Sequence, residues 1–170
     1  EELARVIPVI ERLRTAHDVL ISIDTVKSQV ARAALAAGAD IVNDISAGRS
    51  DPEMADVVRS FRAGFVLMHM RGTPKDMQTG DLYSECIVTE VLEFFRERID
   101  FVRAAGIKSE QLCLDPGIGF GKTLEQNFSL SRSLRTMEVL GRPLLFGISR
   151  KSCLGAVVDR PALQRDAASL

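Results

Sequence analysis

The most informative stretch of this sequence is Leu114-Asp115-Pro116-Gly117-Ile118-Gly119-Phe120-Gly121-Lys122. It places a carboxylate at the end of a short apolar run, and three glycines and a lysine follow. Glycine lets the backbone approach a ligand closely, because it has no Cβ and tolerates positive φ. A second polar stretch, Gly147-Ile148-Ser149-Arg150-Lys151-Ser152, lies at the end of the next apolar run. Together the two stretches predict a ligand site at the ends of buried strands.

Short apolar runs alternate with longer amphipathic segments along the whole chain. Five of these runs predict buried strands, at residues 19–24, 40–45, 64–70, 111–115 and 143–148. Successive apolar residues are typical of parallel strands that are covered on both faces. Between the strands, three segments with helical spacing end near Gly38, Gly106 and Gly141, and glycine often follows a helix end. The alternation predicts an α/β fold with a parallel sheet.

Two α/β architectures agree with this pattern. One is a doubly wound sheet of the flavodoxin type, and the other is part of a TIM (β/α)8 barrel, which needs about 250 residues. The first residues already belong to a helical pattern over residues 3–13, and residues 166–170 look like an interrupted helix. We therefore expect a single, incomplete barrel domain over residues 1–170, with about five of the eight βα units.

The composition is that of an ordinary globular protein. Of its 170 residues, 46% are hydrophobic and 26% are charged, with a formal net charge of −1. Nothing in these values indicates nucleic acid or an anionic membrane as a partner, and no apolar run reaches the roughly 18–20 residues that span a bilayer. The cysteines, Cys86, Cys113 and Cys153, are odd in number and widely spaced. They are typical of reduced thiols, so we expect a cytoplasmic protein.

Polar side chains follow every predicted strand. The five strand ends read Asp24-Thr25, Asn43-Asp44, His69-Met70-Arg71-Gly72, Asp115-Pro116-Gly117 and Ser149-Arg150-Lys151. In both architectures ligands bind at the carboxyl ends of the strands. The sequence therefore predicts one polar site to which several strand ends contribute.

Several of these residues also have a purely structural interpretation. Either residue of Asp24-Thr25 could cap the following helix, and closing a turn is the favoured interpretation of Asp44. His69 lies in an apolar run, so a buried core histidine is favoured over a catalytic one. The glycines could serve turn chemistry alone. Lys151 is harder to explain in this way, because it and the preceding arginine concentrate positive charge where an anionic ligand would fit.

The residue types indicate the kind of ligand. A carboxylate can accept two parallel hydrogen bonds from an amino-pyrimidinone edge, and an asparagine can serve mixed donor and acceptor positions. Phe120 and the methionines offer flat or soft surfaces for a heterocycle. Ser149, Arg150 and Lys151 suit a carboxylate or a phosphate. The sequence thus predicts a site for a polar bicyclic ring and an anion.

At these positions the sequence resembles dihydropteroate synthase. The two quoted stretches match hallmark segments of that family, and the resemblance extends through residues 21–25, 41–45 and 67–74. The five segments occur in the order of the family and cover essentially the whole chain. The resemblance implies a TIM-barrel transferase of folate biosynthesis, a target of sulfonamides and generally a homodimer.

The resemblance also implies a reaction and a site. The family joins 6-hydroxymethyl-7,8-dihydropterin pyrophosphate to p-aminobenzoate, which gives 7,8-dihydropteroate and pyrophosphate. By the resemblance, Asp115 and Lys151 are the catalytic residues. The implied pterin-binding residues are Asp24, Asn43, Met68, Asp115, Phe120, Gly147 and Lys151. The implied p-aminobenzoate-binding residues are Ser149, Arg150 and Lys151, and residues 70–78 resemble a mobile loop of the family.

The implied chemistry is a dissociative substitution at the pterin methylene, in which Mg²⁺ assists the pyrophosphate leaving group. The family holds Mg²⁺ through an asparagine, and pyrophosphate through an arginine and a histidine. The segments that carry these residues have no counterpart here, so we expect no metal ligand in residues 1–170. A barrel with missing strands exposes strand edges and core. We therefore expect little catalysis by these residues alone.

Two other interpretations stay open. One is a corrinoid-linked methyltetrahydrofolate methyltransferase domain, which shares a pterin-binding barrel, although the run Ser149-Arg150-Lys151 favours the synthase. The other is a non-catalytic, truncated pterin-binding fragment. Binding of methyltetrahydrofolate without p-aminobenzoate would indicate the first, and a lack of pterin binding would indicate an inert fragment.

Overall fold

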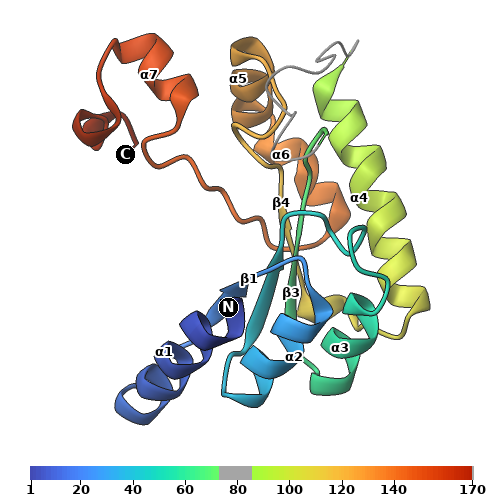
Figure 1. The fold of residues 1–170 in the computed structure, drawn as a ribbon. Helices are drawn as coiled ribbons and strands as arrows, with labels where there is room; N and C mark the ends of the chain where they lie inside the picture. Colours follow the sequence, from blue (N-terminus) through green and yellow to red (C-terminus); the bar gives the residue numbers. More distant parts are fainter. Residues whose placement is uncertain (73–85, 170) are drawn as a thin grey trace.

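The chain folds into parallel strands that alternate with helices (Figure 1). The computed structural model describes residues 1–72 and 86–169. The strands are β1 (Ser22–Asp24), β2 (Ile41–Asp44), β3 (Gly64–Met68) and β4 (Leu112–Asp115). The helices are α1 (Glu2–Ala16), α2 (Ser28–Ala36), α3 (Met54–Phe61), α4 (Ile87–Ala104), α5 (Leu124–Arg132), α6 (Leu134–Met137) and α7 (Ser152–Val158). Short 3-10 turns occur at Ser109–Gln111, Glu138–Leu140, Ala162–Gln164 and Ala167–Ser169.

One parallel sheet, in the strand order β1-β2-β3-β4, forms the centre of the molecule. Strands that are neighbours in space follow one another in the sequence, and a helix connects each pair. A doubly wound sheet reverses its strand order, whereas a (β/α) barrel does not. The topology therefore confirms the α/β class and is that of a partial barrel.

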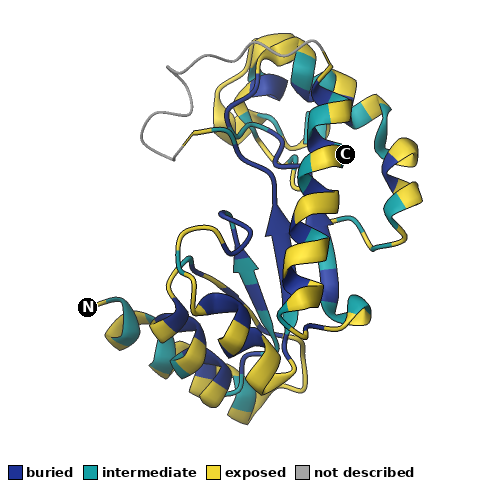
Figure 2. Cartoon of the chain, turned by 90° about the vertical axis from the view of Figure 1, so that its right-hand side faces the viewer, coloured by how far each residue is buried: buried dark blue, intermediate teal, exposed yellow. Residues whose placement is uncertain are grey.

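The two faces of the sheet differ, because successive side chains of a strand point to opposite faces. The outer face carries Ile23, Val42, Phe65, Leu67 and Leu114, which are buried in one hydrophobic core. Residues of the helices, α4 in particular, complete this core, and the exposed side of α4 faces away from the sheet (Figure 2). Burial of the outer face thus fixes which side chains face inward.

Residues 143–148 do not form the predicted fifth strand. Only Leu144 pairs with β4, in a single parallel bridge to Leu114. The bridge consists of hydrogen bonds from Leu114 N to Pro143 O (2.9 Å) and from Leu145 N to Leu114 O (2.8 Å). Its continuation would need an N–H from Pro116, and proline has none. The prediction was wrong because the apolar pattern extends beyond the point at which β4 can pair.

The helices also differ from the predicted pattern. The structure contains α3, which the sequence analysis did not predict, although Met54, Val57 and Val58 are buried at helical spacing. The predicted helix before Gly141 is divided into α5 and α6 at Ser133. Within the described ranges, no helix is long and apolar enough to cross a membrane.

Candidate functional site

Asp115 is the last residue of β4, and its side chain is buried at the carboxyl end of the sheet. Its Oδ1 accepts a hydrogen bond from the Gly117 N–H at 2.7 Å. Burial raises the pKa of this carboxyl, while the Gly117 N–H and the cations Lys151 and Lys122 act in the opposite direction. A carboxylate has about four acceptor positions, so Asp115 retains capacity to accept hydrogen bonds from a ligand.

Three other residues predicted for the pterin site share the inner face of the sheet with Asp115. Asp24 lies opposite Asn43, and Met68 lies opposite Asp115. Asn43 in turn lies opposite Val66, two residues before Met68. Because strand side chains alternate with a period of two, all of these residues point to one face. The strand register therefore assembles this part of the predicted site.

Asn43 carries an unsatisfied acceptor at this face. Its Nδ2 donates to Asp24 Oδ1 at 2.5 Å. Its Oδ1 is buried, and no partner for it exists among residues 1–72 and 86–169. A buried polar atom without a hydrogen bond is costly and needs an explanation. The arrangement suits a ligand that donates a hydrogen bond at this point.

Lys151 reaches the glycine-rich stretch from the second quoted segment. Its Nζ donates to the carbonyl of Ile118 and lies 4.2 Å from the centroid of the Phe120 ring. Burial lowers the pKa of Lys151, and the nearby Asp115 carboxylate opposes this effect. The fold thus brings a carboxylate, an ammonium group and an aromatic ring into one region.

Gly147, Ser149 and Arg150 have a different setting, because all three are exposed on the segment that leads to α7. The backbone of Arg150 has a positive φ of 53°, and its N–H donates to Ser169 Oγ at 2.9 Å. These contacts tie Arg150 to the turn at Ala167–Ser169. In the described part of the chain, no hydrogen bond or ion pair joins any of the three to Asp115.

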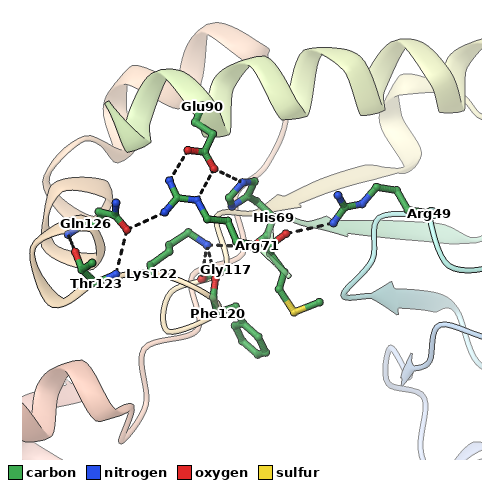
Figure 3. A network of polar contacts seen from close by, with 10 residues as sticks. Arg49, His69, Arg71, Glu90, Gly117, Phe120, Lys122, Thr123 and Gln126 are labelled. Carbon is green, nitrogen blue, oxygen red and sulfur yellow. Dashed lines mark hydrogen bonds and ion pairs between the residues drawn. The ribbon is translucent and has the colours of Figure 1, made fainter. Parts of the chain in front are cut away.

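Lys122 is a site residue that the sequence analysis did not single out, although it ends the quoted stretch. It is only 5% exposed, and its Nζ donates to the carbonyls of Gly117, Phe120 and His69 (Figure 3). Burial lowers its pKa to about 7. Lysine is rarely buried without a partner. In the sequence, the role of Lys122 is indicated only by its position directly after a glycine-rich loop.

A second polar network lies beside Lys122 and joins the segment after β3 to α4 and α5 (Figure 3). His69 Nε2 lies 3.4 Å from Glu90 Oε1. Arg71 donates from Nε to the same oxygen at 2.7 Å and from Nη1 to Gln126 Oε1 at 3.1 Å. Burial lowers the pKa of His69 to about 3, so this histidine is neutral. The interpretation of His69 as a buried core residue agrees with this setting.

The predicted loop at residues 70–78 begins in this network. Residues 70–72 are described, and residues 73–78 lie outside the described residues. A cavity of about 340 Å³ adjoins the carboxyl ends of β2 and β3, and its lining consists of Val26, Ile45, Ser46, Arg49, Ser50, Met70 and Gly72. Asp44 closes the adjacent turn, as predicted, by accepting from Ser46 N at 2.7 Å and from Gly48 N at 2.9 Å.

The site is lined by hydrogen-bonding and charged groups. Among the residues that the structure describes, no group of three or more His, Cys, Asp or Glu side chains could hold a metal ion. The inner face offers the Asp115 carboxylate and the Asn43 amide oxygen, and the Lys151 ammonium group lies beside the Phe120 ring and near Asp115. Such a set fits a flat heterocycle that donates hydrogen bonds along one edge.

Comparisons with known proteins agree with this description. The chain matches the family model described as "pterin binding enzyme" over residues 1–170. It is 48% identical over 161 residues to the dihydropteroate synthase of Synechocystis, a match that covers 95% of this chain and 55% of that protein. The chain therefore spans little more than half the length of this relative.

Solved structures give the same result. The dihydropteroate synthase of Yersinia pestis, in a complex with a sulfonamide drug, matches with a TM-score of 0.94 and 38% identity, over 98% of this chain and 60% of that one. The enzyme of Xanthomonas albilineans, in complex with 7,8-dihydropteroate, matches with a TM-score of 0.88 and 41% identity, over 98% and 60%. These similarities support the synthase interpretation over the corrinoid-linked methyltransferase, and the fold is a partial TIM barrel.

Proposed function

Because the chain belongs to the pterin-binding enzyme family, we propose that it forms the pterin-binding part of a dihydropteroate synthase of folate biosynthesis. The proposed reaction joins 6-hydroxymethyl-7,8-dihydropterin pyrophosphate to p-aminobenzoate. The observation that carries this proposal is the inner-face pair of acceptors, the buried Asp115 carboxylate and Oδ1 of Asn43, which has no hydrogen-bond partner among the described residues. The relatives bound to a sulfonamide drug and to 7,8-dihydropteroate support the substrate class.

Asp115 is proposed to hold the amino-pyrimidinone edge of the pterin. That edge presents two parallel N–H donors, as a guanidinium does, and a carboxylate accepts such a pair well. Asn43 and Asp24 complete the polar rim, and Met68 and Phe120 contact the ring faces. Lys151, which lies beside Phe120 and near Asp115, is proposed to bind the pterin and to position the second substrate.

The proposed reaction is a substitution at the pterin methylene carbon. The bond from this carbon to the pyrophosphate oxygen breaks, and its electron pair leaves with pyrophosphate. The amine nitrogen of p-aminobenzoate then forms the new C–N bond and releases a proton to water. The chain contributes by orienting both reactants and by stabilising charge. Ser149 and Arg150, exposed beside Gly147, are proposed to bind the carboxylate of p-aminobenzoate.

The proposal extends to Mg²⁺, oligomeric state and location. Mg²⁺ would assist the pyrophosphate leaving group. No step is assigned to it, because the described residues include no cluster of three or more His, Cys, Asp or Glu side chains that could hold a metal ion. A homodimer, a cytoplasmic location and inhibition by sulfonamides belong to the same proposal. The sulfonamide complex of the Yersinia pestis relative supports the last of these.

Isothermal titration calorimetry of the intact protein that contains this chain tests the proposal. Wild-type protein should bind dihydropterin pyrophosphate, and p-aminobenzoate should then bind to that complex. Asp115→Asn should weaken pterin binding by about 2–3 kcal/mol, because one acceptor of a charged hydrogen-bonded pair becomes a donor. Asp40→Asn is the matched control. Asp40 binds Arg14 and the Ile21 N–H at the opposite end of the sheet, so its loss should leave pterin affinity unchanged.

Two outcomes would contradict the proposal. Unchanged affinity in Asp115→Asn would show that the pterin binds elsewhere. Binding of methyltetrahydrofolate without any binding of p-aminobenzoate would indicate the corrinoid-linked methyltransferase instead. Both readouts report binding, so they do not depend on the turnover of the protein.

A further inference from the structure

Lys122 has an unusual set of partners for a buried cation. Its Nζ lies 2.9 Å from Gly117 O, 3.0 Å from Phe120 O and 3.1 Å from His69 O. An ammonium group has three N–H donors, and three backbone carbonyls accept from it. Figure 3 shows these oxygens converging on Nζ between the end of β3 and the glycine-rich stretch. Lys122 therefore joins two segments that are distant in the sequence.

The carbonyls that Lys122 binds belong to the residues that hold the pterin anchor. Gly117 donates its N–H to Asp115 Oδ1 at 2.7 Å, and its own carbonyl accepts from Lys122 and from the Phe120 N–H at 3.1 Å. The His69 N–H donates to the Asp115 carbonyl at 2.9 Å. Lys122 thus binds the carbonyls of the two residues, Gly117 and His69, whose N–H groups donate to Asp115. It also binds the carbonyl of Phe120, whose ring lies at the site.

The approach of these segments is very close. Gly117 has a φ of +67°, and a Cβ at this position would lie 1.9 Å from His69 O. Three carbonyl oxygens that converge on one point repel one another, because each carries partial negative charge. The Lys122 ammonium group neutralises this repulsion, whereas an apolar side chain would leave the oxygens unsatisfied. The hydrogen bonds from Lys122 therefore stabilise this arrangement of the loop.

We propose that Lys122 is a positioning residue of the pterin site, which fixes the Asp115 carboxylate through Gly117 and the Phe120 ring through its carbonyl. This inference rests on the proposed function, because it assumes that Asp115 binds the pterin. Lys122 does not need to touch the substrate, since it acts through the glycine-rich loop. The buried charge also favours the ionised form of Asp115, as does Lys151, while Asp24 disfavours it.

The test compares Lys122→Met with Arg98→Met in the intact protein. Arg98 in α4 is 6% exposed, and its Nε donates to the Ala47 carbonyl at 3.0 Å. It is thus an equally buried cation bonded to a backbone carbonyl, but it has no partner in the glycine-rich loop. Both variants remove a buried charge and both should lower the melting temperature. Only the first should alter the pterin site.

Calorimetry with dihydropterin pyrophosphate gives the first readout. Lys122→Met should raise the dissociation constant by about 10-fold or more, because carbonyls beside the anchor lose their donor. Arg98→Met should change it by less than about 2-fold, because sites that share no partners act independently. If Lys122→Met does not fold, Lys122→Gln keeps part of the donor capacity and should show a smaller increase than about 10-fold, still above that of Arg98→Met.

The pH dependence of binding gives a second readout that a purely structural role would not change. Loss of the Lys122 charge should raise the pH at which binding fails on acidification, because Asp115 loses a neighbouring cation. The proposal is overturned if the lysine variants bind the pterin as tightly as wild type, or if Arg98→Met weakens binding equally. A wild-type protein that does not bind the pterin would instead refute the proposed function, so the two failures are distinguishable.

Discussion

Asp115 is a buried carboxyl group whose pKa is raised. Its side chain is buried, and burial raises its pKa although a backbone N–H and two lysines act in the opposite direction. A carboxylate is kept in such a position only where other interactions compensate for its desolvation. The pterin edge, with its two donors, is the compensation that we propose. The fold thus sets the pKa of Asp115 and of Lys151 through burial and through their proximity to each other.

The raised pKa of Asp115 predicts an acid limit for pterin binding. Only the ionised carboxylate accepts both hydrogen bonds, and its population falls as the pH drops through the pKa. Binding should therefore weaken at a higher pH than the ordinary pKa of an aspartate, about 3.9, would give. Calorimetric titrations between about pH 8 and pH 4 check this. Asp115→Asn should bind weakly at every pH, and an acid limit that persists in this variant would contradict the assignment.

Single residues also show what a sequence pattern can and cannot reveal. Asp115, Asn43 and Lys151 were predicted as site residues because polar residues at strand ends are informative on their own. Lys122 and Glu90 were not, because their importance comes from partners far away in the sequence. Lys122 binds the carbonyl of His69, and Glu90 binds Arg71. Local spacing contains no information about such pairs.

The glycine-rich stretch at residues 116–122 follows β4 and forms the loop of the proposed binding site. Pro116 ends the ladder, and positive φ values at Gly117, Gly119 and Gly121 turn the chain back toward β3. Thr123 then caps α5, by accepting from the Gln126 N–H at 3.2 Å while the Gln126 side chain accepts from Thr123 N. This order of proline, glycines and cap is readable from sequence.

Gly117→Ala tests whether this turn needs glycine. The new Cβ would lie 1.9 Å from His69 O at a φ of +67°, so the loop should shift and both stability and pterin affinity should fall. We expect a loss of roughly 1–3 kcal/mol in the free energy of unfolding, measured by urea denaturation. Gly141→Ala is the matched control, because Gly141 has a φ of +61° and nothing lies within 4 Å of its Cβ position. Equal losses in both variants would show that close packing at Gly117 is unimportant.

The whole molecule is a partial barrel with one polar inner face. Helices cover the outer face of the sheet and produce the hydrophobic core, and the inner face carries four of the predicted pterin residues, Asp24, Asn43, Met68 and Asp115. Leu144 makes the only strand contact beyond β4 within the described residues. The curated relative from Synechocystis is matched over only 55% of its length. A complete barrel needs more strands than this sheet contains.

A polypeptide limited to residues 1–170 should therefore be a poor catalyst. The described residues include no cluster of three or more His, Cys, Asp or Glu side chains that could hold a metal ion, and an open sheet edge favours self-association. We expect pyrophosphate release far below that of a full-length relative, together with a larger apparent mass in size-exclusion chromatography. Normal turnover by a 170-residue polypeptide of verified mass would contradict this expectation. The relative from Synechocystis, assayed in parallel, is the reference.

The sequence by itself determined the α/β class, four of the five predicted strands and the polar character of their ends, because apolar runs and turn residues act locally. It also indicated the pterin-binding family through motifs that stand in a fixed order. The folded structure was needed to show that residues 143–148 leave the sheet after one bridge, that Asn43 Oδ1 has no partner among the described residues and that Lys122 joins the end of β3 to the anchor loop. These features depend on hydrogen bonds between residues far apart in the chain, which form only when the sheet register and the burial of the core bring them together.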